Sequence, residues 1–370
     1  MKKPYRTLAA AAGLWLILSA LGVHAYLIDT VIRVPLSYYV FQPPPRGGGY
    51  TDAVFGTTIK RISDARNTPS AEGGGPLTFI TNEYSTMSPF NQDNTRLILQ
   101  HYSYFALYDG AGGYLRDLPF EVHASSQPRW SRTEASVLYY ISGNRLKKLN
   151  VETGAAAVVH TFAEYTEING HGESDISLDG NHFVFSGDRR EVFVYQISTD
   201  TKGPVFDTAG HAFDALYITP DNNVTITYYE TGTGRYTGVE MFDRNMVFKR
   251  QLAHASGHQD FTRELDGTEV LLWINSGDPW PLAGCPNGIE KIRTSDGHKT
   301  CVVSFEWGQG VHVSAPDRNG WFILETYVPS DPSPTSGWGR YTNEILQIKL
   351  DGSEVRRLLH HRSRPFDSYW

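Results

Sequence analysis

The sequence has few cysteines. Cys285 and Cys301 are the only two among 370 residues. In an oxidising compartment such a pair predicts a disulfide, which would hold the proline-rich loop 278–286 against a hairpin expected at 289–303. A zinc pair is the weaker alternative, because structural zinc sites use closely spaced cysteines and these two are sixteen positions apart.

The chain beyond residue 25 also lacks helical periodicity. No segment sustains apolar residues at positions i, i+3, i+4 and i+7, which excludes a helical solenoid. A Gly-x-Ser-x-Gly motif is missing, and the glycine-rich pieces at 110–113 and 232–238 lack the strand-to-helix context of a phosphate-binding loop. Serine hydrolase and phosphate-loop chemistry are therefore not expected.

An excess of basic charge is absent as well. The formal net charge is −7 at pH 7, whereas binding to phosphate groups needs clustered lysine and arginine. We therefore expect neither nucleic acid nor an anionic membrane surface as a partner.

Residues 1–25 predict a secretory signal peptide. Basic residues at positions 2, 3 and 6 precede an apolar run from Leu8 to Leu21, and Val23 and Ala25 are small residues suited to cleavage before Tyr26. The run is short for a membrane span. An uncleaved anchor is the alternative, because the chain stays moderately apolar after Tyr26. Both interpretations place the folded part in the periplasm or outside the cell, and cleavage would leave no membrane span.

The rest of the chain divides into a linker at 26–51 and one folded domain at 52–370. The linker contains Pro43-Pro44-Pro45 and Gly47-Gly48-Gly49, runs that are expected to have no capacity to pack. The stretch 54–62 then alternates like a strand.

The domain repeats itself. Each repeat has a histidine and, some residues later, an apolar strand rich in Val, Tyr, Phe and Trp. The turn before that strand is Asp-Gly at 179–180 and at 266–267, and it is looser in the other repeats. The histidines, at intervals of 48, 40, 47 and 54 residues, are His123, His171, His211, His258 and His312. Periods of forty to fifty residues in short β-strands are typical of propeller blades.

We therefore predict an all-β propeller of six to seven four-stranded blades. The first blade is expected at about 77–118, the second at 123–162, and the next four begin near the remaining histidines of the repeat. A seventh blade would need residues 360–370 together with the strand at 54–62, and it would be incomplete. The second blade contains Pro128-Arg129-Trp130-Ser131, an apolar strand, and Leu146-x-x-Leu149 followed by Thr153-Gly154. This order of motifs resembles the TolB-type, WD40-like propeller repeat. That resemblance covers about residues 54–370 and implies the fold rather than a function.

The recurring histidines have two interpretations. A Gly-His pair can support its own blade by bonding to a nearby acid, a role suited to Asp260 beside His258 and to Glu173 beside His171. Alternatively, loops that lead into the innermost strands gather at one mouth of a propeller, where histidines can hold a metal ion or transfer a proton.

The stretch Gln309-Gly310-Val311-His312 resembles a motif of the oligogalacturonate lyases, and the chain has a weaker similarity to the ulvan lyases. The resemblance implies that His258, Gln309 and His312 hold a divalent ion such as manganese or calcium, although Ser314 stands where a further histidine would be. It also implies that His211 acts as the base and that Arg189 or Arg190 acts on the sugar. His171 is a further catalytic candidate.

Two functions follow as hypotheses. The first is a polysaccharide lyase that cleaves an acidic polysaccharide or oligosaccharide by β-elimination. The second is a noncatalytic propeller that binds a protein or glycan partner in the cell envelope. Paired acids for glycoside hydrolysis, drawn from Glu173, Asp175, Asp214 and Asp260, are a less favoured third.

Overall fold

The computed structural model describes residues 26–35, 38–120, 126–171, 173–305, 310–315, 319–327 and 336–361. The segment predicted to be a signal peptide, His123, Gln309 and the stretch from 362 to the C-terminus lie outside the described residues. Within the described ranges, no helix is long and apolar enough to cross a membrane.

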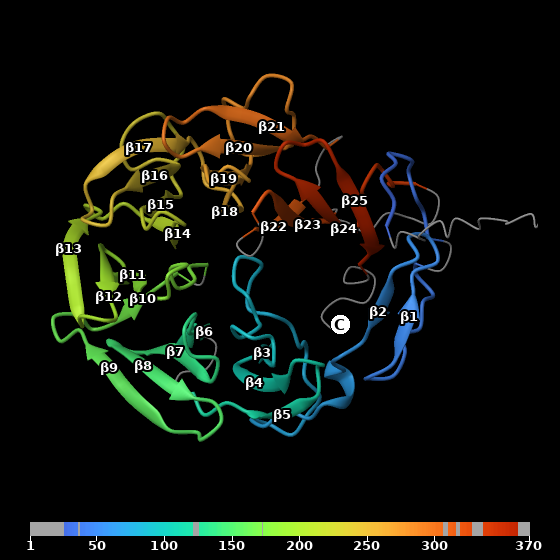
Figure 1. The fold of residues 1–370 in the computed structure, drawn as a ribbon, viewed down its shortest axis with the longest axis horizontal. Coiled ribbons are helices and arrows are strands. Elements are labelled where there is room, and N and C mark those ends of the chain that lie inside the picture. The colour runs from blue at the N-terminus through green and yellow to red at the C-terminus, as the bar shows by residue number, and fades with distance from the viewer. Residues whose placement is uncertain are drawn as a thin grey trace, which may run out of the picture.

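Six antiparallel sheets form a ring around a common centre, so the predicted all-β propeller is confirmed (Figure 1). The strands, in chain order and grouped by blade, are β3 Arg96–His101, β4 Tyr104–Asp109, β5 Tyr114–Asp117; β6 Arg129–Trp130, β7 Val137–Ser142, β8 Arg145–Asn150, β9 Ala156–Thr161; β10 Ile168–Asn169, β11 His182–Gly187, β12 Glu191–Gln196, β13 Thr201–Asp207; β14 Phe213–Ile218, β15 Val224–Tyr228, β16 Val239–Phe242, β17 Phe248–Ala253; β18 Gln259–Arg263, β19 Glu269–Ile274, β20 Ile289–Arg293, β21 Lys299–Val303; and β22 Gly310–Ser314, β23 Trp321–Tyr327, β24 Glu344–Lys349, β25 Val355–His360.

The first blade differs from the other five. It has three strands, whereas the others have four. On its inner side only isolated bridges are formed, between Thr81 and Gln100 and between Phe90 and Leu97. The chain before β3 therefore takes the place of an innermost strand without the regular pairing of one.

The sequence left a choice between six and seven blades, and the described residues form six. The strand expected at 54–62 is present as β2 (Thr58–Lys60), which pairs with β1 (Gly49–Thr51). This pair lies between the last blade and the first (Figure 1). Nearly all of the stretch 360–370, which a seventh blade would need, lies outside the described residues.

The core lies between neighbouring blades. Tyr139 of the second blade packs with Phe183 and Phe193 of the third, and Phe162 completes this cluster from the connection between them. The strands β11 and β19 are buried along their whole length, because each blade has neighbours on both faces. Aromatic and β-branched side chains fit such pleated, covered surfaces, which explains the composition of the repeats.

The Asp-Gly turns have the conformation that glycine allows. Gly180 and Gly267 have φ of +71° and +90°, in the left-handed region that glycine enters without a steric penalty. Oδ1 of Asp266 accepts a hydrogen bond of 2.9 Å from the backbone N–H of Thr268. These turns fix the start of β11 and of β19, as the repeat predicted.

The segment 26–51 is more than a linker. Leu27 pairs with Arg357 of β25, and Tyr38 is completely buried. The buried guanidinium of Arg357 forms an ion pair of 2.7 Å with Asp29. The expectation that this segment has no capacity to pack is therefore wrong, because a few of its side chains have specific partners on the last blade.

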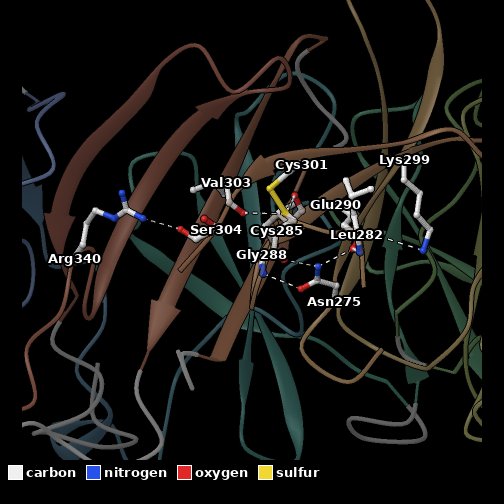
Figure 2. Close-up of a disulfide and its surroundings, with 11 residues drawn as sticks. Asn275, Leu282, Cys285, Gly288, Glu290, Lys299, Cys301, Val303, Ser304 and Arg340 are labelled. Atoms are coloured by element: carbon white, nitrogen blue, oxygen red, sulfur yellow. Dashed lines mark hydrogen bonds and ion pairs between the residues drawn. A yellow bond between two sulfur atoms is a disulfide. The ribbon is translucent and has the colours of Figure 1, made fainter. Parts of the chain in front are cut away.

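The predicted disulfide is present. Cys285 and Cys301 are bonded, with their Cα atoms 5.5 Å apart, and the bond joins the connection after β19 to β21 (Figure 2). Beside it, the side-chain amide of Asn275 donates hydrogen bonds of 2.7 Å to the carbonyl of Cys285 and to Glu290. The loop 278–286 is thus held both by the disulfide and by the hydrogen bond from Asn275.

Candidate functional site

One end of the ring collects the loops that carry the histidines. The chain enters each innermost strand at this end, and the connection between the second and third strands returns to it because neighbouring strands are antiparallel. The N–H of Ile274, at the end of β19, donates a 3.1 Å hydrogen bond to the carbonyl of His258, which precedes β18. We call this end the histidine face. It carries His171, His211, His258 and His312, together with the turn that contains Arg189 and Arg190.

Two histidines from neighbouring blades meet at a tyrosine from the first blade. The ring centroids of His258 and His312 are 4.7 Å apart. The hydroxyl of Tyr84 lies 3.1 Å from Nδ1 of His258, and the ring centroids of Tyr84 and His312 are 5.9 Å apart. The structure thus brings together two of the three predicted metal ligands.

His312 is oriented by a carboxylate on the neighbouring strand. Its Nδ1 lies 2.9 Å from Oε2 of Glu325, the residue directly opposite on β23. The ring also stacks on Tyr327, with centroids 5.3 Å apart. An ionised carboxylate only accepts hydrogen bonds, so Nδ1 of His312 carries the proton and Nε2 is left with its lone pair.

His258 reaches the same state through Tyr84. The Tyr84 hydroxyl lies 3.1 Å from Nδ1 of His258, and the nearby carboxylate of Glu173 accepts a hydrogen bond from the hydroxyl of Tyr217. When the Tyr84 oxygen accepts a hydrogen bond from Nδ1–H of His258, Nε2 of His258 has an available lone pair.

Burial shifts the pKa values of these groups in the direction that favours their neutral forms. Desolvation by burial is the largest cause that lowers the pKa of His258. Desolvation also raises the pKa of Glu173, and desolvation with the carboxylates of Glu173 and Asp214 raises that of Tyr84. At neutral pH, His258 is therefore an uncharged imidazole, the form that binds metals and accepts protons.

His211 stands in a more open place on the histidine face. Its Nδ1 lies 3.0 Å from Oε1 of Glu230, and its ring stacks on Tyr236 with centroids 4.4 Å apart. Both partners belong to the connection between β15 and β16 of the same blade. Its side chain remains 35% exposed, so the imidazole of His211 is oriented by Glu230 and partly open to solvent.

The remaining predicted residues differ in their surroundings. Nε2 of His171 lies 2.9 Å from the hydroxyl of Ser186, and burial, followed by the charge of nearby Arg189, lowers the pKa of His171 to about 4. Arg189 contacts Glu167 at 3.2 Å and keeps 68% of its side chain exposed. Arg190 instead points to the outermost strand, where it makes a two-pronged contact of 2.9 and 2.7 Å with Asp207.

The acids considered as blade supports or as paired acids for glycoside hydrolysis have other partners. Oδ2 of Asp260 accepts a 2.7 Å hydrogen bond from the N–H of Ala315, so it joins β18 to the neighbouring blade. Asp214 accepts a bond of 2.9 Å from Tyr229, and Asp175 pairs with Arg132 at 2.9 Å.

The described residues include no group of three or more His, Cys, Asp or Glu side chains placed to hold a metal ion. They do supply two imidazoles whose Nδ1 atoms are already held by oxygen, which is how metal-ligating histidines are usually oriented. This donor pair suits a divalent ion, and Gln309, the third predicted ligand, lies outside the described residues.

Sequence reasoning missed two members of the site. Tyr84 lies in the irregular stretch before β3, where no strand pattern or histidine repeat draws attention to it. Glu325 occupies an ordinary position in the alternating strand β23. The pairing of β22 with β23 places Glu325 opposite His312, so a correct register would have identified it.

Comparisons with known proteins support the fold. No family model matches the chain, and no curated protein matches its sequence. Among solved structures, it is similar to an oligogalacturonate lyase in complex with manganese, at 12% identity over 85% of this chain and 84% of that one, with a TM-score of 0.55. An oligogalacturonate lyase from Vibrio parahaemolyticus gives 12% identity, the same coverage and a TM-score of 0.56. TolB from Acinetobacter baumannii gives 16% identity over 78% of this chain and 65% of that one, with a TM-score of 0.40. At these identities, the likeness to the oligogalacturonate lyases confirms a shared propeller fold.

Proposed function

We propose that this chain is an exported polysaccharide lyase that cleaves uronate-containing glycans by β-elimination at the histidine face. One observation carries the proposal. His211, His258 and His312 each have Nδ1 held by an oxygen, of Glu230, Tyr84 and Glu325 respectively. Three imidazoles with available Nε2 atoms suit proton removal and cation binding better than they suit the support of individual blades.

His211 is the proposed base. Glu230 fixes its tautomer, and its exposure leaves room for a sugar of a polymeric substrate. In the reaction, Nε2 of His211 removes the C5 proton beside the uronate carboxylate. The electron pair forms the C4–C5 double bond, the C4–O4 bond breaks, and O4 takes up a proton from solvent.

Neutralisation of the substrate carboxylate makes the C5 proton more acidic. Arg189 is the proposed partner for this carboxylate, because it is exposed on the same face and its side chain has only one contact with an exposed acid, Glu167. A divalent ion, when held by His258, His312 and Gln309, would supply further positive charge to that carboxylate. Glu325 and Tyr84 then act by holding the imidazoles in place.

Export is part of the proposal. The N-terminal basic residues, the apolar run that follows them and the disulfide all favour a periplasmic or secreted protein.

The test uses the purified protein and a panel of polyuronates, with ultraviolet absorbance reporting the unsaturated uronate product. We expect absorbance to rise with wild-type protein and manganese, and to stay flat with His211→Ala. If no polyuronate gives a rise, with or without manganese or calcium, the lyase assignment is wrong. A noncatalytic role as a binding propeller in the cell envelope would then replace it.

A further inference from the structure

A pocket lies away from the histidine pair, between the first blade and the segment that precedes β1. Three tyrosines line it, Tyr104 and Tyr108 of β4 and Tyr114 of β5, and its cavity volume is about 270 Å³. This volume lies just below the range of about 300–1,000 Å³ that is common for ligand pockets, so the space suits one small ring.

Its inner end holds a buried histidine. His101 lines the pocket but is only 1% exposed. Its Nε2 lies 2.6 Å from the hydroxyl of Tyr108, whereas its Nδ1 is buried without a hydrogen-bond partner. Burial lowers the pKa of His101 to about 4, so the ring is neutral and Nδ1 is an unsatisfied donor or acceptor. Among the residues that line this pocket, His101 has the one side-chain atom that is buried without a hydrogen-bond partner, and a hydroxyl group of a ligand can supply that bond.

The walls are aromatic and partly open. Tyr114 keeps 46% of its surface exposed, and its ring centroid lies 5.7 Å from that of Tyr108 and 6.3 Å from that of His101. The rings of Tyr108 and Tyr114 are nearly perpendicular, with an interplanar angle of 83°. The partly exposed ring of Tyr114 is therefore the surface on which the apolar face of a ligand can stack.

The pocket is lined by one positively charged and one negatively charged side chain. Arg46 and Asp117 both line it, so one guanidinium and one carboxylate are available together. An anionic ligand would meet Asp117, and a purely apolar ligand would leave the polar groups of Arg46, Asp117 and His101 without partners. A neutral ring with hydroxyl groups on its edge and C–H groups on its face satisfies all of these side chains.

We propose that this pocket binds a neutral hexopyranose unit of a glycan, stacked on Tyr114 and hydrogen-bonded to Nδ1 of His101. The pocket is separate from the histidine pair, so the proposal does not depend on the lyase activity. It adds a second carbohydrate contact to the ring, at the border between the first blade and the N-terminal segment.

Ligand-detected NMR tests the proposal, with the methyl glycosides of glucose, galactose and mannose as probes at millimolar concentration. We expect saturation transfer to at least one of them from the full-length protein. Tyr114→Ala should weaken binding about tenfold or more, as expected for loss of an aromatic anchor. Leu115→Ala is the matched control, because Leu115 is similarly exposed on the same strand, and alternation points it to the other face. Thermal unfolding of both variants checks that they fold.

Three results would overturn the proposal. One is the absence of binding by all three glycosides. Another is a methyl glucuronide that binds more tightly than the matching glucoside, since a neutral site does not favour the anion. The third is binding that survives Tyr114→Ala and disappears in His258→Ala, which would place the sugar at the histidine pair instead.

Discussion

The imidazole rings of His258 and His312 lie 4.7 Å apart between centroids, although they come from different blades. Each ring has its Nδ1 atom held by an oxygen, from Tyr84 or from Glu325. The orientation of each ring, with a lone pair on Nε2, is therefore set before any ligand arrives. This lowers the entropic cost of binding a ligand. This preorganisation leads to the first prediction.

Substitution of either histidine should abolish manganese binding. We expect wild-type protein to bind the ion in isothermal titration calorimetry, and His258→Ala and His312→Ala to show no measurable heat. Glu325→Gln removes only the carboxylate behind His312 and should weaken binding by about 10–100-fold. The control is His298→Ala, because His298 is exposed in a turn of the fifth blade. Equal affinity in all four variants would contradict a site at the histidine pair.

The proposed base offers a sharper test, because the chain has a second histidine with the same kind of contact. Nδ1 of His211 is held by Glu230 at 3.0 Å, and Nδ1 of His160 by Asp200 at 2.6 Å. His160 lies on the outermost strand of the second blade. His211→Ala should reduce the rate of β-elimination by about 10²–10⁴-fold, the usual contribution of a general base. His160→Ala should leave the rate unchanged.

The two variants should also differ little in stability, since each loses one partly exposed hydrogen bond to a carboxylate, worth about 0.5–1.5 kcal/mol. Urea unfolding measures this directly. A loss of activity in His211→Ala accompanied by a much larger loss of stability would favour a supporting role for His211 within its blade.

The fold was largely predictable from the sequence, because its strands and turns are specified by residues that lie close together in the chain. In the second blade, the Pro-x-Trp-Ser stretch, the apolar strand and the Thr-Gly turn each follow from short-range rules, and β6 to β9 are found where these rules place them. The segment 26–51 was misjudged because the partner of Leu27 and Asp29 is Arg357, at the other end of the sequence. The composition of a segment indicates whether it tends to pack, but it does not identify a partner that is distant in the sequence.

The candidate site was predictable only in part. The histidine repeat identified His258 and His312, because equivalent positions of neighbouring blades meet at one end of a ring. Tyr84 could not be found in this way, since it comes from the irregular part of the first blade. The roles expected for Asp260 and Glu173 depended on proximity in sequence, whereas their bonds run to Ala315 and Tyr217 on other blades.

The buried histidines predict how stability depends on pH. Burial lowers the pKa of His101 and of His171 from 6.5 to about 4. Between these values, the unfolded chain binds protons that the folded chain excludes. The stabilisation is therefore complete above pH 6.5 and is lost as the pH falls toward about 4. For each histidine, the loss by about pH 4.5 is roughly 3 kcal/mol at most.

Urea unfolding of wild type and His171→Gln at about pH 7 and about pH 4.5 isolates this effect. Several buried carboxylates, including Glu173 and Glu344, have raised pKa values and act in the opposite direction, so the comparison must be between the two proteins. We expect acidification to destabilise wild type more than His171→Gln. The same acid dependence in both would show that His171 takes up its proton at an ordinary pH in the folded state.

The disulfide should stabilise the fifth blade by restricting the unfolded chain. Cys285 and Cys301 are separated by 16 residues, and closing a loop of this length is worth about 3 kcal/mol. We expect the double variant Cys285→Ala/Cys301→Ala to lose about that much unfolding free energy in urea titration. Wild-type protein in reductant should show a similar loss, because both treatments remove the same constraint. Asn275 should keep the loop near its place in the folded state through its bonds to Cys285 and Glu290, so manganese binding should persist in the double variant. Loss of manganese binding on reduction would instead mean that the disulfide helps to position His258, which belongs to the same blade.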